Sequence, residues 1–526
     1  MILSKGNVSD ITFIGAGIAS AYTLLKYLEE LSKLNTSNTL YINIIEKYPE
    51  FFCGIPYGQR SGNSVLLINS LREFLPDDER ALFISWLKER KKDLIEEFLR
   101  CGGEESKRWL SNNIKDIEID CWDELFVPRS FFGNFIVSKV KKAIEQAEGK
   151  KLVKINYIVS EVIDLQKENN QFEIKLIKEQ SLLSEKVVIS IGSLPKNRIY
   201  SKKRALEESD FLLINDIYDE ELDLNFNKIE SFLLNRKEKE TNILIIGANA
   251  SCLEIIYRLN NKREVNNSID NYIILSTYGL MPDTKVSNAV KNNYYPEHLN
   301  NLQTKNELTA KNIKDAAFKD LELAEKSSLG SGSIVDSISN ALITLLEKLN
   351  KKEKEIFACN YGNEIGRRQR CAGIHYTSVL DKLKMSNKFI HVAGKFSKIS
   401  KYDKSKYKFE YVDTKTSKNI TYQKDIHLVV NCIGSIDLEN QNVPDFIKNI
   451  MTNEFCIAND SKIGFKVNNK FESSKNFFIS GPLLAGNVIK GKALWHLEHC
   501  GRIIWTSNLL GKSLIKKTNT NLITLE

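Results

Sequence analysis

Ile11-Thr12-Phe13-Ile14-Gly15-Ala16-Gly17-Ile18-Ala19-Ser20 is the stretch that decides the fold. A short apolar strand precedes a turn with two glycines, and the turn opens a helical pattern over residues 19–31. Gly15 makes the tight bend, and Gly17 removes the Cβ that would block an approaching phosphate. Ser20 keeps the third position small, although glycine or alanine is usual there. The stretch therefore predicts the strand–turn–helix unit that opens a dinucleotide-binding fold.

An acidic residue follows at the end of the next predicted strand, residues 41–45. Glu46 lies 31 residues after Gly15, whereas the usual spacing is about 20. The polar stretch 33–38 accounts for the extra length. A carboxylate at this place can accept both ribose hydroxyls of an adenosine, so we expect Glu46 to bind a dinucleotide. The alternative is a generic turn of this kind that holds no ligand.

The same pattern occurs a second time further along the chain. Residues 242–246 form a predicted strand, Gly247-x-Asn249-x-Ser251 a turn, 252–259 a helix and 272–275 another strand. The second strand ends Leu275-Ser276-Thr277 without an acidic residue. A carboxylate there would repel a 2′-phosphate, so its absence favours NADPH over NADH. The alternative is a vestigial second fold that binds no coenzyme.

Two further predicted strands end alike, at Ile191-Gly192-Ser193 and at Ile433-Gly434-Ser435. Each follows one of the two nucleotide-binding patterns. A strand that ends in Gly-Ser lets the chain leave sharply beside a bound ligand. We therefore place Gly192 and Gly434 among the candidate cofactor-binding residues.

Several loops resemble those of the bacterial FAD/NAD(P)-binding protein family, a relative of the flavin-dependent N-hydroxylases. Gly54-Ile55-Pro56-Tyr57-Gly58 is similar to that family's Gly-x-Ala-Tyr-Gly loop, and Leu66-Leu67-Ile68-Asn69 to its Leu-Leu-Asn-Val segment. The stretch from Pro128 and Arg129 to Gly133 resembles its Pro-Arg-x-x-x-Gly, and Gly481-Pro482 the turn that returns to the flavin ring. The resemblance covers residues 10–195 and 428–505, and more loosely 242–280.

The resemblance implies an α/β fold with two Rossmann-like dinucleotide-binding domains, the FAD domain being discontinuous, and a helical insertion. The expected FAD domain comprises residues 1–210 and 420–526, and the NAD(P)H domain residues 235–415 with the insertion at 297–358. Tyr57, Asn69 and Arg129 should lie near the FAD, with Gly434 and Gly481 over its ring. The implied cofactors are FAD and NADPH or NADH.

The implied function is that of an NAD(P)H-using oxidoreductase. By resemblance it is a monooxygenase that transfers oxygen through a flavin hydroperoxide to a small amine- or carboxylate-bearing substrate. The flavin carries such chemistry while the protein orients it and excludes water. Two alternatives stay open: a flavin reductase or dehydrogenase that transfers no oxygen, and a non-catalytic nucleotide-binding module.

A basic stretch after the helical region is a candidate substrate site. Arg367, Arg370, His375 and Tyr376 lie within ten residues of one another. Guanidinium groups recognise carboxylate or phosphate, and histidine or tyrosine can donate to a substrate or transfer a proton. The prediction is a pocket for an anionic substrate or for a 2′-phosphate; the alternative is a solvated basic turn.

The bulk sequence excludes several other classes. The net charge is +8, from 75 Lys and Arg against 67 Asp and Glu, and the basic residues alternate with acidic ones, which predicts no nucleic-acid partner. None of the nine cysteines forms a Cys-x-x-Cys pair, so a thiol-disulfide reductase is not expected. No apolar run reaches about 18 residues, which predicts a cytoplasmic protein without a membrane partner. His496 and His499 lack a third ligand, so no metal is expected.

The segments outside these motifs also have patterns that predict helices, strands or loops. We expect a loop over residues 49–76, helices at 80–100 and 134–148, a charged connector at 196–240 and short strands at 385–425. A strand at 477–479 and a helix from about Lys492 to Leu510 close the chain.

Overall fold

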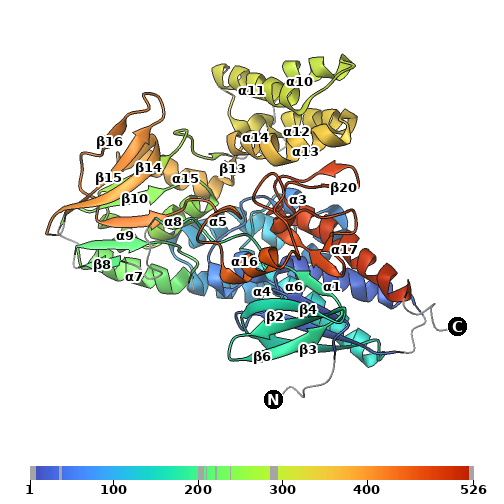
Figure 1. Ribbon diagram of the computed structural model, residues 1–526. Helices are drawn as coiled ribbons and strands as arrows, with labels where there is room; N and C mark the ends of the chain where they lie inside the picture. Colours follow the sequence, from blue (N-terminus) through green and yellow to red (C-terminus); the bar gives the residue numbers. More distant parts are fainter. Residues whose placement is uncertain are drawn as a thin grey trace.

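The computed structural model describes residues 8–34, 38–199, 206–208, 210–219, 222–236, 239–284, 294–327, 329–404 and 406–520. Two sheets and a helical body make up most of the chain. In Figure 1 the first sheet lies at the bottom, the second at the left and the helical body at the top, with the carboxyl-terminal segment in orange and red near the middle.

Six of the described strands form the first sheet, in the order β18-β19-β7-β1-β2-β3. Neighbouring strands in this sheet pair in parallel, except β18 and β19, which pair antiparallel. All four side chains of β1 are buried, as expected for a strand with helices on both faces. The strands are β1 (Ile11–Ile14), β2 (Leu40–Glu46), β3 (Val153–Val159), β7 (Val187–Ile189), β18 (Glu472–Ser474) and β19 (Phe477–Ile479).

Both ends of the chain build this sheet, which confirms a discontinuous first domain. Strand β19 pairs with β7, and helix α17 (Cys500–Thr520) packs along helix α1 (Ile18–Leu31). The contact is close, because a Cβ on Gly511 would lie 2.8 Å from the Thr23 carbonyl oxygen. The Ser507 hydroxyl also donates to the Ala19 carbonyl over 3.2 Å.

The second sheet has the order β16-β15-β14-β11-β10-β17-β9-β8 among the described strands. Its centre, from β14 to β9, is parallel, and its two edges are antiparallel. The strands are β8 (Leu206–Glu208), β9 (Phe211–Ile214), β10 (Asn242–Ile246), β11 (Asn271–Ser276), β14 (Phe389–Asp403), β15 (Lys406–Asp413), β16 (Asn419–Thr421) and β17 (Leu428–Asn431).

Strand pairing shifts the expected domain boundaries. Strand β17 lies between β10 and β9, so residues 428–431 belong to the second sheet and not to the carboxyl-terminal FAD segment. Strands β8 and β9 also join it, so this sheet starts well before residue 235. The interval 196–240, expected to be a connector, thus holds two strands and helix α7 (Leu222–Leu234).

Short strands form three smaller sheets. They are β4 (Val162–Glu168), β5 (Gln171–Leu176) and β6 (Gln180–Ser184), then β12 (Asp283–Thr284) with β13 (Cys371–Ala372), and β20 (Val488–Ile489) with β21 (Lys492–Ala493). The helix expected from Lys492 is therefore wrong. Lys490 and Gly491 both have positive φ, 51° and 77°, which is the geometry of a two-residue hairpin turn. The last helix begins only at Cys500.

Residues 385–425 hold strands β14, β15 and β16, as expected, but the first of them is long. Strand β14 has 15 residues, and its pairing with β15 shifts register between Phe396 and Lys398 and again between Lys401 and Asp403. Such irregularities break the side-chain alternation on which the sequence pattern depends.

The remaining helices cover the sheets or form the helical body. The expected loop 49–76 contains α2 (Gly54–Tyr57) and α3 (Leu71–Phe74). Next come α4 (Asp77–Cys101), α5 (Glu104–Glu118), α6 (Arg129–Gly149), α8 (Ala250–Asn260), α9 (Arg263–Asn267), α15 (Ile374–Met385) and α16 (Asp445–Thr452). The insertion comprises α10 (Glu297–Asn301), α11 (Ala310–Lys326), α12 (Ser331–Lys348), α13 (Lys351–Ile356) and α14 (Gly362–Arg368). It has a hydrophobic core of its own.

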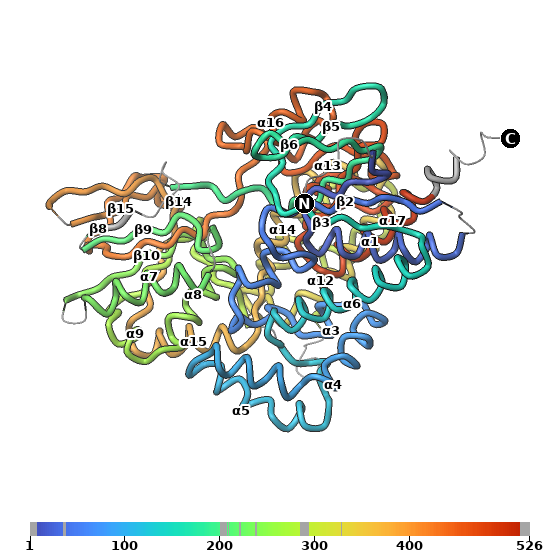
Figure 2. The backbone as a smooth tube through the Cα atoms, turned by 90° about the horizontal axis from the view of Figure 1, so that it is seen from below, coloured from blue at the N-terminus to red at the C-terminus, as the bar shows by residue number. Residues whose placement is uncertain are grey.

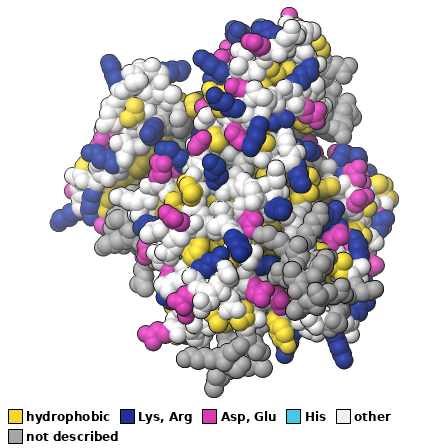
Figure 3. Space-filling view, turned by 45° about the vertical axis from the view of Figure 1, so that its right-hand side comes forward, with side chains coloured by type: hydrophobic (Ala, Val, Ile, Leu, Met, Phe, Trp, Pro, Cys, Tyr) yellow, Lys and Arg dark blue, Asp and Glu magenta, His cyan; other side chains and the backbone are white. Residues whose placement is uncertain are grey.

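From below, the second sheet lies to one side of the first, and α4 and α5 lie along the lower edge of the view (Figure 2). The face in Figure 3 mixes Lys and Arg with Asp and Glu and shows no continuous basic stripe. Within the described ranges no helix is long and apolar enough to cross a membrane. Nor do those residues include a group of three His, Cys, Asp or Glu side chains placed to hold a metal ion.

Candidate functional site

The turn between β1 and α1 is held in place by a close backbone approach and by a side-chain hydrogen bond. Gly15 has φ +90°, and a Cβ there would lie 2.5 Å from the Ser190 carbonyl oxygen at the end of β7. The Ser20 hydroxyl donates to the Gly15 carbonyl over 2.5 Å. Ser20 therefore does more than keep its position small, because it fixes the turn that Gly15 makes.

The helix end beyond this turn is open to a ligand. Gly17 is the N-cap of α1 and supplies no side-chain cap. A Cβ on Gly17 would meet, within 4 Å, only the Gly54 Cα at 3.7 Å, so this glycine lines free space. Gly192 likewise has nothing within 4 Å of its missing Cβ. An uncapped helix N-terminus with room in front of it suits a pyrophosphate.

Two other features converge on this helix end. Gly481, with φ +73°, lies where its missing Cβ would be 3.2 Å from the Ala19 side chain. The Glu46 carboxylate accepts the Ala16 backbone N–H at 2.7 Å, the Lys47 N–H at 2.9 Å and the Tyr48 N–H at 3.4 Å. A carboxylate has about four acceptor positions, so Glu46 keeps room for a ribose hydroxyl. These residues fit the dinucleotide part of FAD.

The loop from residue 54 to 69 lies against the start of α6. The Tyr57 ring packs edge-on to Phe132 at 5.0 Å between centroids. Burial, and then the neighbouring Cys500 thiol, raise the pKa of Tyr57. Asn69 is half-buried two residues beyond Leu67, whose N–H donates to the Val127 carbonyl over 2.8 Å. The role of Tyr57 and Asn69 in binding the cofactor stays a prediction.

Arg129 joins the two dinucleotide-binding units. Its guanidinium forms an ion pair with Glu254 of α8, and the Tyr218 hydroxyl donates to the same carboxylate. The side chains of Arg129 and Glu254 are 13% and 3% exposed, so this is a buried pair at the domain interface. No motif in the sequence points to Glu254 or Tyr218.

The second turn differs from the first. Gly247 has φ +107°, and a Cβ there would lie 2.5 Å from the Cys432 carbonyl oxygen. Asn249 caps α8, because its Oδ1 accepts the Cys252 N–H at 3.3 Å while its Nδ2 donates to the Cys432 carbonyl over 2.7 Å. The Lys196 ammonium donates to the Ser251 hydroxyl over 3.2 Å. A protein side chain thus occupies the helix end that is open in the first turn.

Gly434 follows β17 on the second sheet. Its missing Cβ has nothing within 4 Å, and the adjoining Ser435 forms a bridge to Lys196. Gly434 therefore lies beside the second turn. Its expected position over the flavin ring stays a prediction.

The four predicted substrate residues do not share one pocket, which corrects the sequence interpretation. Tyr376 is buried, and its hydroxyl donates to the Leu66 carbonyl over 2.9 Å. Both ring nitrogens of His375 are buried without a hydrogen-bond partner. Burial, and then the Arg129 charge, lower the pKa of His375 to about 3. Both side chains are packing residues at the domain interface, while Arg367 and Arg370 remain exposed.

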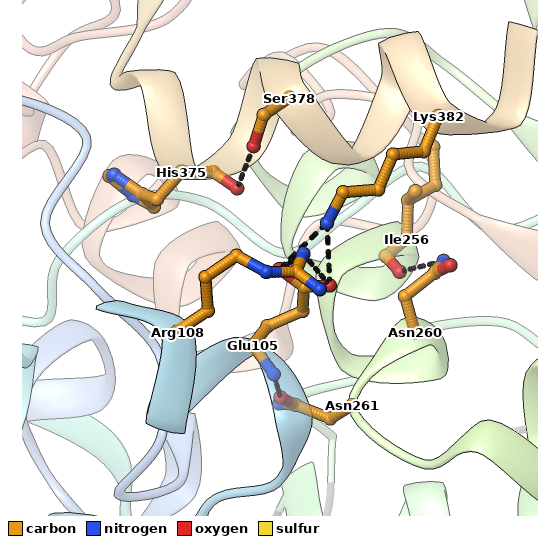
Figure 4. Close-up of polar contacts among 8 residues, drawn as sticks. All are labelled: Glu105, Arg108, Ile256, Asn260, Asn261, His375, Ser378 and Lys382. Atoms are coloured by element: carbon orange, nitrogen blue, oxygen red, sulfur yellow. Dashed lines mark hydrogen bonds and ion pairs between the residues drawn. The ribbon is translucent and has the colours of Figure 1, made fainter. Parts of the chain in front are cut away.

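A second ionic contact, absent from the sequence interpretation, lies beside this helix (Figure 4). Glu105 is 7% exposed and pairs with Arg108 at 2.7 Å and with Lys382 of α15 at 3.1 Å. The Glu105 N–H donates to Asn261 Oδ1 over 3.0 Å. Figure 4 shows the His375 ring pointing away from this cluster. The cluster of Glu105, Arg108 and Lys382 lies between α5, α8 and α15, which indicates a role in holding the domains together.

Residues 12–194 match the model of a family described as FAD-NAD(P)-binding. An uncharacterized protein of Mycobacterium tuberculosis is 28% identical over 513 residues, which is 96% of this chain and 95% of that protein. A protein of Mycobacterium bovis matches to the same extent.

Solved flavoproteins share the fold over nearly the whole length. The FAD-bound cadaverine monooxygenase of desferrioxamine biosynthesis from Erwinia amylovora has a TM-score of 0.55 at 11% identity, covering 97% of this chain and 95% of that one. The ornithine N-hydroxylase of Kutzneria sp. 744 has a TM-score of 0.54 at 12% identity, and the match covers 97% of this chain and 100% of that one. The L-lysine 6-monooxygenase of Pseudomonas syringae has a TM-score of 0.53 at 12% identity, and the match covers 97% of this chain and 99% of that one. The expected two-dinucleotide-binding-domain flavoprotein fold is thus confirmed.

Proposed function

We propose that this protein is an FAD-dependent, NAD(P)H-using oxidoreductase, and specifically a monooxygenase acting on a small substrate that carries an amine or a carboxylate. One observation carries the proposal. The N-terminus of α1 is uncapped and faces free space at Gly17, with the Glu46 carboxylate beside it. This arrangement offers the N–H groups that a pyrophosphate requires and the acceptor that an adenosine ribose requires.

The residues of the chain have separate tasks in this proposal. The backbone of the first turn and α1 would hold the pyrophosphate, and Glu46 the ribose. Bound FAD would supply hydride acceptance from NAD(P)H and reactivity toward oxygen. The buried pair of Arg129 and Glu254 would hold the second domain in a fixed position against the first and exclude water from the space between them.

The fold neighbours motivate the choice of a monooxygenase. The three solved proteins named above are a cadaverine monooxygenase, an ornithine N-hydroxylase and an L-lysine 6-monooxygenase. Their identities with this chain are 11% to 12%, so the amine substrate is part of the proposal and not a finding.

The test starts with the visible absorption of the purified full-length protein. We expect a flavin spectrum, reduction by NADPH faster than by NADH under nitrogen, and a hydroxylated product when air and an amine such as cadaverine, L-ornithine or L-lysine are admitted. Reduction followed by hydrogen peroxide alone with every amine would instead indicate a reductase or dehydrogenase. A protein that remains colourless with added FAD would contradict both enzyme functions.

A second candidate is a flavoprotein whose second domain does not use a nicotinamide coenzyme. The Asn249 side chain favours it, because it satisfies the α8 helix end that a coenzyme pyrophosphate would otherwise occupy. In that case dithionite would reduce the flavin, whereas neither NADPH nor NADH would. Reduction by either coenzyme would contradict this candidate.

A further inference from the structure

The segment that leaves the first sheet after β7 crosses the carboxyl edge of the second sheet. Lys196 in this segment forms a β-bridge with Ser435, just beyond the end of β17. The neighbouring Asn197 N–H donates to the Gly434 carbonyl over 3.1 Å, and the Asn431 side chain donates to the Asn197 carbonyl over 2.8 Å. The backbone around Lys196 is therefore fixed at the carboxyl end of β17.

The Lys196 side chain extends from there to the N-terminus of α8. Its ammonium donates to the Ser251 hydroxyl over 3.2 Å and lies 5.0 Å from the centroid of the Tyr218 ring. Asp216 lies in the same region, and Glu254 of α8 has its own cationic partner. In the described part of the chain neither of these carboxylates, nor any other, forms an ion pair with Lys196. A hydroxyl and an aromatic ring thus hold the ammonium at this helix end.

Two backbone donors at this helix end are also free. The N–H groups of Ala250 and Ser251 make no hydrogen bond with any described residue, whereas the Asn249 side chain accepts the Cys252 N–H at 3.3 Å. The N-terminus of a helix carries about half a positive charge, which repels a cation. Lys196 adds a full positive charge here. An anion at this place would contact the ammonium and both free N–H groups, and would offset their repulsion.

This helix end lies on the path of a coenzyme across the second sheet. In folds of this kind a dinucleotide binds along the carboxyl edge of the parallel strands, with its pyrophosphate at the N-terminus of the helix that follows the first strand. The strand order β11-β10-β17 would place the adenosine half at the end of β11 and the rest of the coenzyme toward β17. Gly434, beside Lys196, has nothing within 4 Å of its missing Cβ, so there is free space in that direction.

We propose that Lys196 binds the pyrophosphate of the nicotinamide coenzyme. The inference rests on the proposed function, because it takes the second domain to be the NAD(P)H domain. In the first turn Gly17 lets a phosphate approach the helix backbone closely. In the second turn Asn249 stands in that position and keeps a phosphate further from the helix, and the charge at the tip of a long side chain supplies the attraction that is lost. NADH and NADPH share the pyrophosphate, so Lys196 does not select between them.

Binding of the oxidised coenzymes tests this without turnover. Isothermal titration calorimetry measures the affinity of the full-length protein, with and without FAD, for NADP⁺, for NAD⁺ and for adenosine 2′-monophosphate, which has no pyrophosphate. We expect Lys196→Met to weaken the binding of NADP⁺ and NAD⁺ by the same factor, about 10-fold, since a hydrogen bond to a charged group contributes about that much. The affinity for adenosine 2′-monophosphate should stay unchanged.

Two controls separate the charge of Lys196 from a structural effect of its replacement. Lys305→Met removes the same charge from an exposed lysine of the helical insertion, and it should change each affinity less than about twofold. The loss in Lys196→Met should shrink between about 0.05 M and about 0.5 M salt, because dissolved ions screen the ammonium. A displaced helix would lower the affinity equally at both salt concentrations. Circular dichroism establishes that each variant is folded.

Four results would overturn the inference: unchanged affinity for both coenzymes in Lys196→Met, a loss that does not depend on salt, a loss confined to NADP⁺ and adenosine 2′-monophosphate, and a wild type that binds neither coenzyme. The third would assign Lys196 to the 2′-phosphate. The proposed function fails separately. A protein that takes up no FAD but binds both coenzymes through Lys196 would contradict the flavoprotein proposal and leave this inference standing.

Discussion

Gly15 and Gly17 show at the scale of single residues how one motif combines two constraints. Gly15 is required by the protein itself, since a Cβ would lie 2.5 Å from the Ser190 carbonyl oxygen. Gly17 is constrained little by the protein, since the nearest atom to its missing Cβ is 3.7 Å away. The first glycine therefore serves the fold, and the second leaves free space at the N-terminus of α1.

Gly17→Val tests this division. We expect the purified variant to be folded and to contain less than about a tenth of the wild-type FAD, because the added methyl groups fill the space in front of α1. Flavin absorbance per protein and circular dichroism measure the two properties. Gly366→Val is the control, since Gly366 also has nothing near its missing Cβ but lies in α14; it should keep its FAD. Full FAD content in Gly17→Val would mean that the cofactor lies elsewhere.

His375 contributes a pH dependence whose sign follows from its surroundings. Its pKa of about 3 in the folded protein is below the ordinary 6.5. As the pH falls below about 6.5, the unfolded state takes up the proton first, so stability decreases until the folded pKa near 3 is reached. We expect His375→Phe to lose less thermal stability than the wild type between pH 7 and about pH 4, as measured by differential scanning fluorimetry.

At neutral pH the same variant should be as stable as the wild type or more stable. Phenylalanine fits the aromatic neighbours Phe126, Tyr257 and Tyr376 and removes two buried nitrogens without partners. Parallel stability curves for variant and wild type would show that His375 does not titrate in this range.

At the scale of elements, helix α8 holds the two domains together through Glu254. Glu254→Gln leaves Arg129 buried without its countercharge, and we expect a loss of about 3–5 kcal/mol in the free energy of unfolding. The double variant Arg129→Met/Glu254→Leu should lose less than the sum of the single losses, because neither charge is then left alone. Urea denaturation of the wild type, Arg129→Met, Glu254→Leu and the double variant gives the coupling, and strictly additive losses would contradict a direct interaction.

The N-terminus of α8 offers a different prediction. Asn249→Gly removes the cap and restores the second glycine of the usual motif. We expect stability to fall by at most a few tenths of a kcal/mol, which is the usual cost of glycine in place of an asparagine cap. The variant should bind NADPH more tightly than the wild type, as measured by the NADPH concentration that half-saturates flavin reduction. An unchanged half-saturation would show that the coenzyme does not approach this helix end.

At the scale of the whole molecule, FAD should stabilise the protein as a unit. The proposed site combines the first turn, the end of β7 and the returning β19, and these segments come from opposite ends of the chain. A ligand at 100 times its Kd adds about 2.7 kcal/mol to the free energy of unfolding. We expect a single thermal transition that rises on adding FAD to apoprotein, and no rise in Gly17→Val.

The sequence by itself determined the two dinucleotide turns and the strand–helix units around them. These signals are local, because a glycine that a turn requires and an apolar strand lie within about ten residues of each other. Gly15, Gly17, Ser20 and Glu46 accordingly meet at one place, as expected. The sequence pattern does not predict the hairpin at Lys490 and Gly491, because a turn of two residues between strands of two residues is too short to interrupt a helical pattern.

Only the tertiary structure decided which residues act together. Arg367, Arg370, His375 and Tyr376 are neighbours in sequence, yet the Tyr376 side chain and both ring nitrogens of His375 are buried at the domain interface, while the two arginines are exposed. Arg129 and Glu254 form a pair across 125 residues. Spacing along a chain fixes the geometry within one helix or turn, whereas the partner of a buried charge depends on which elements pack together.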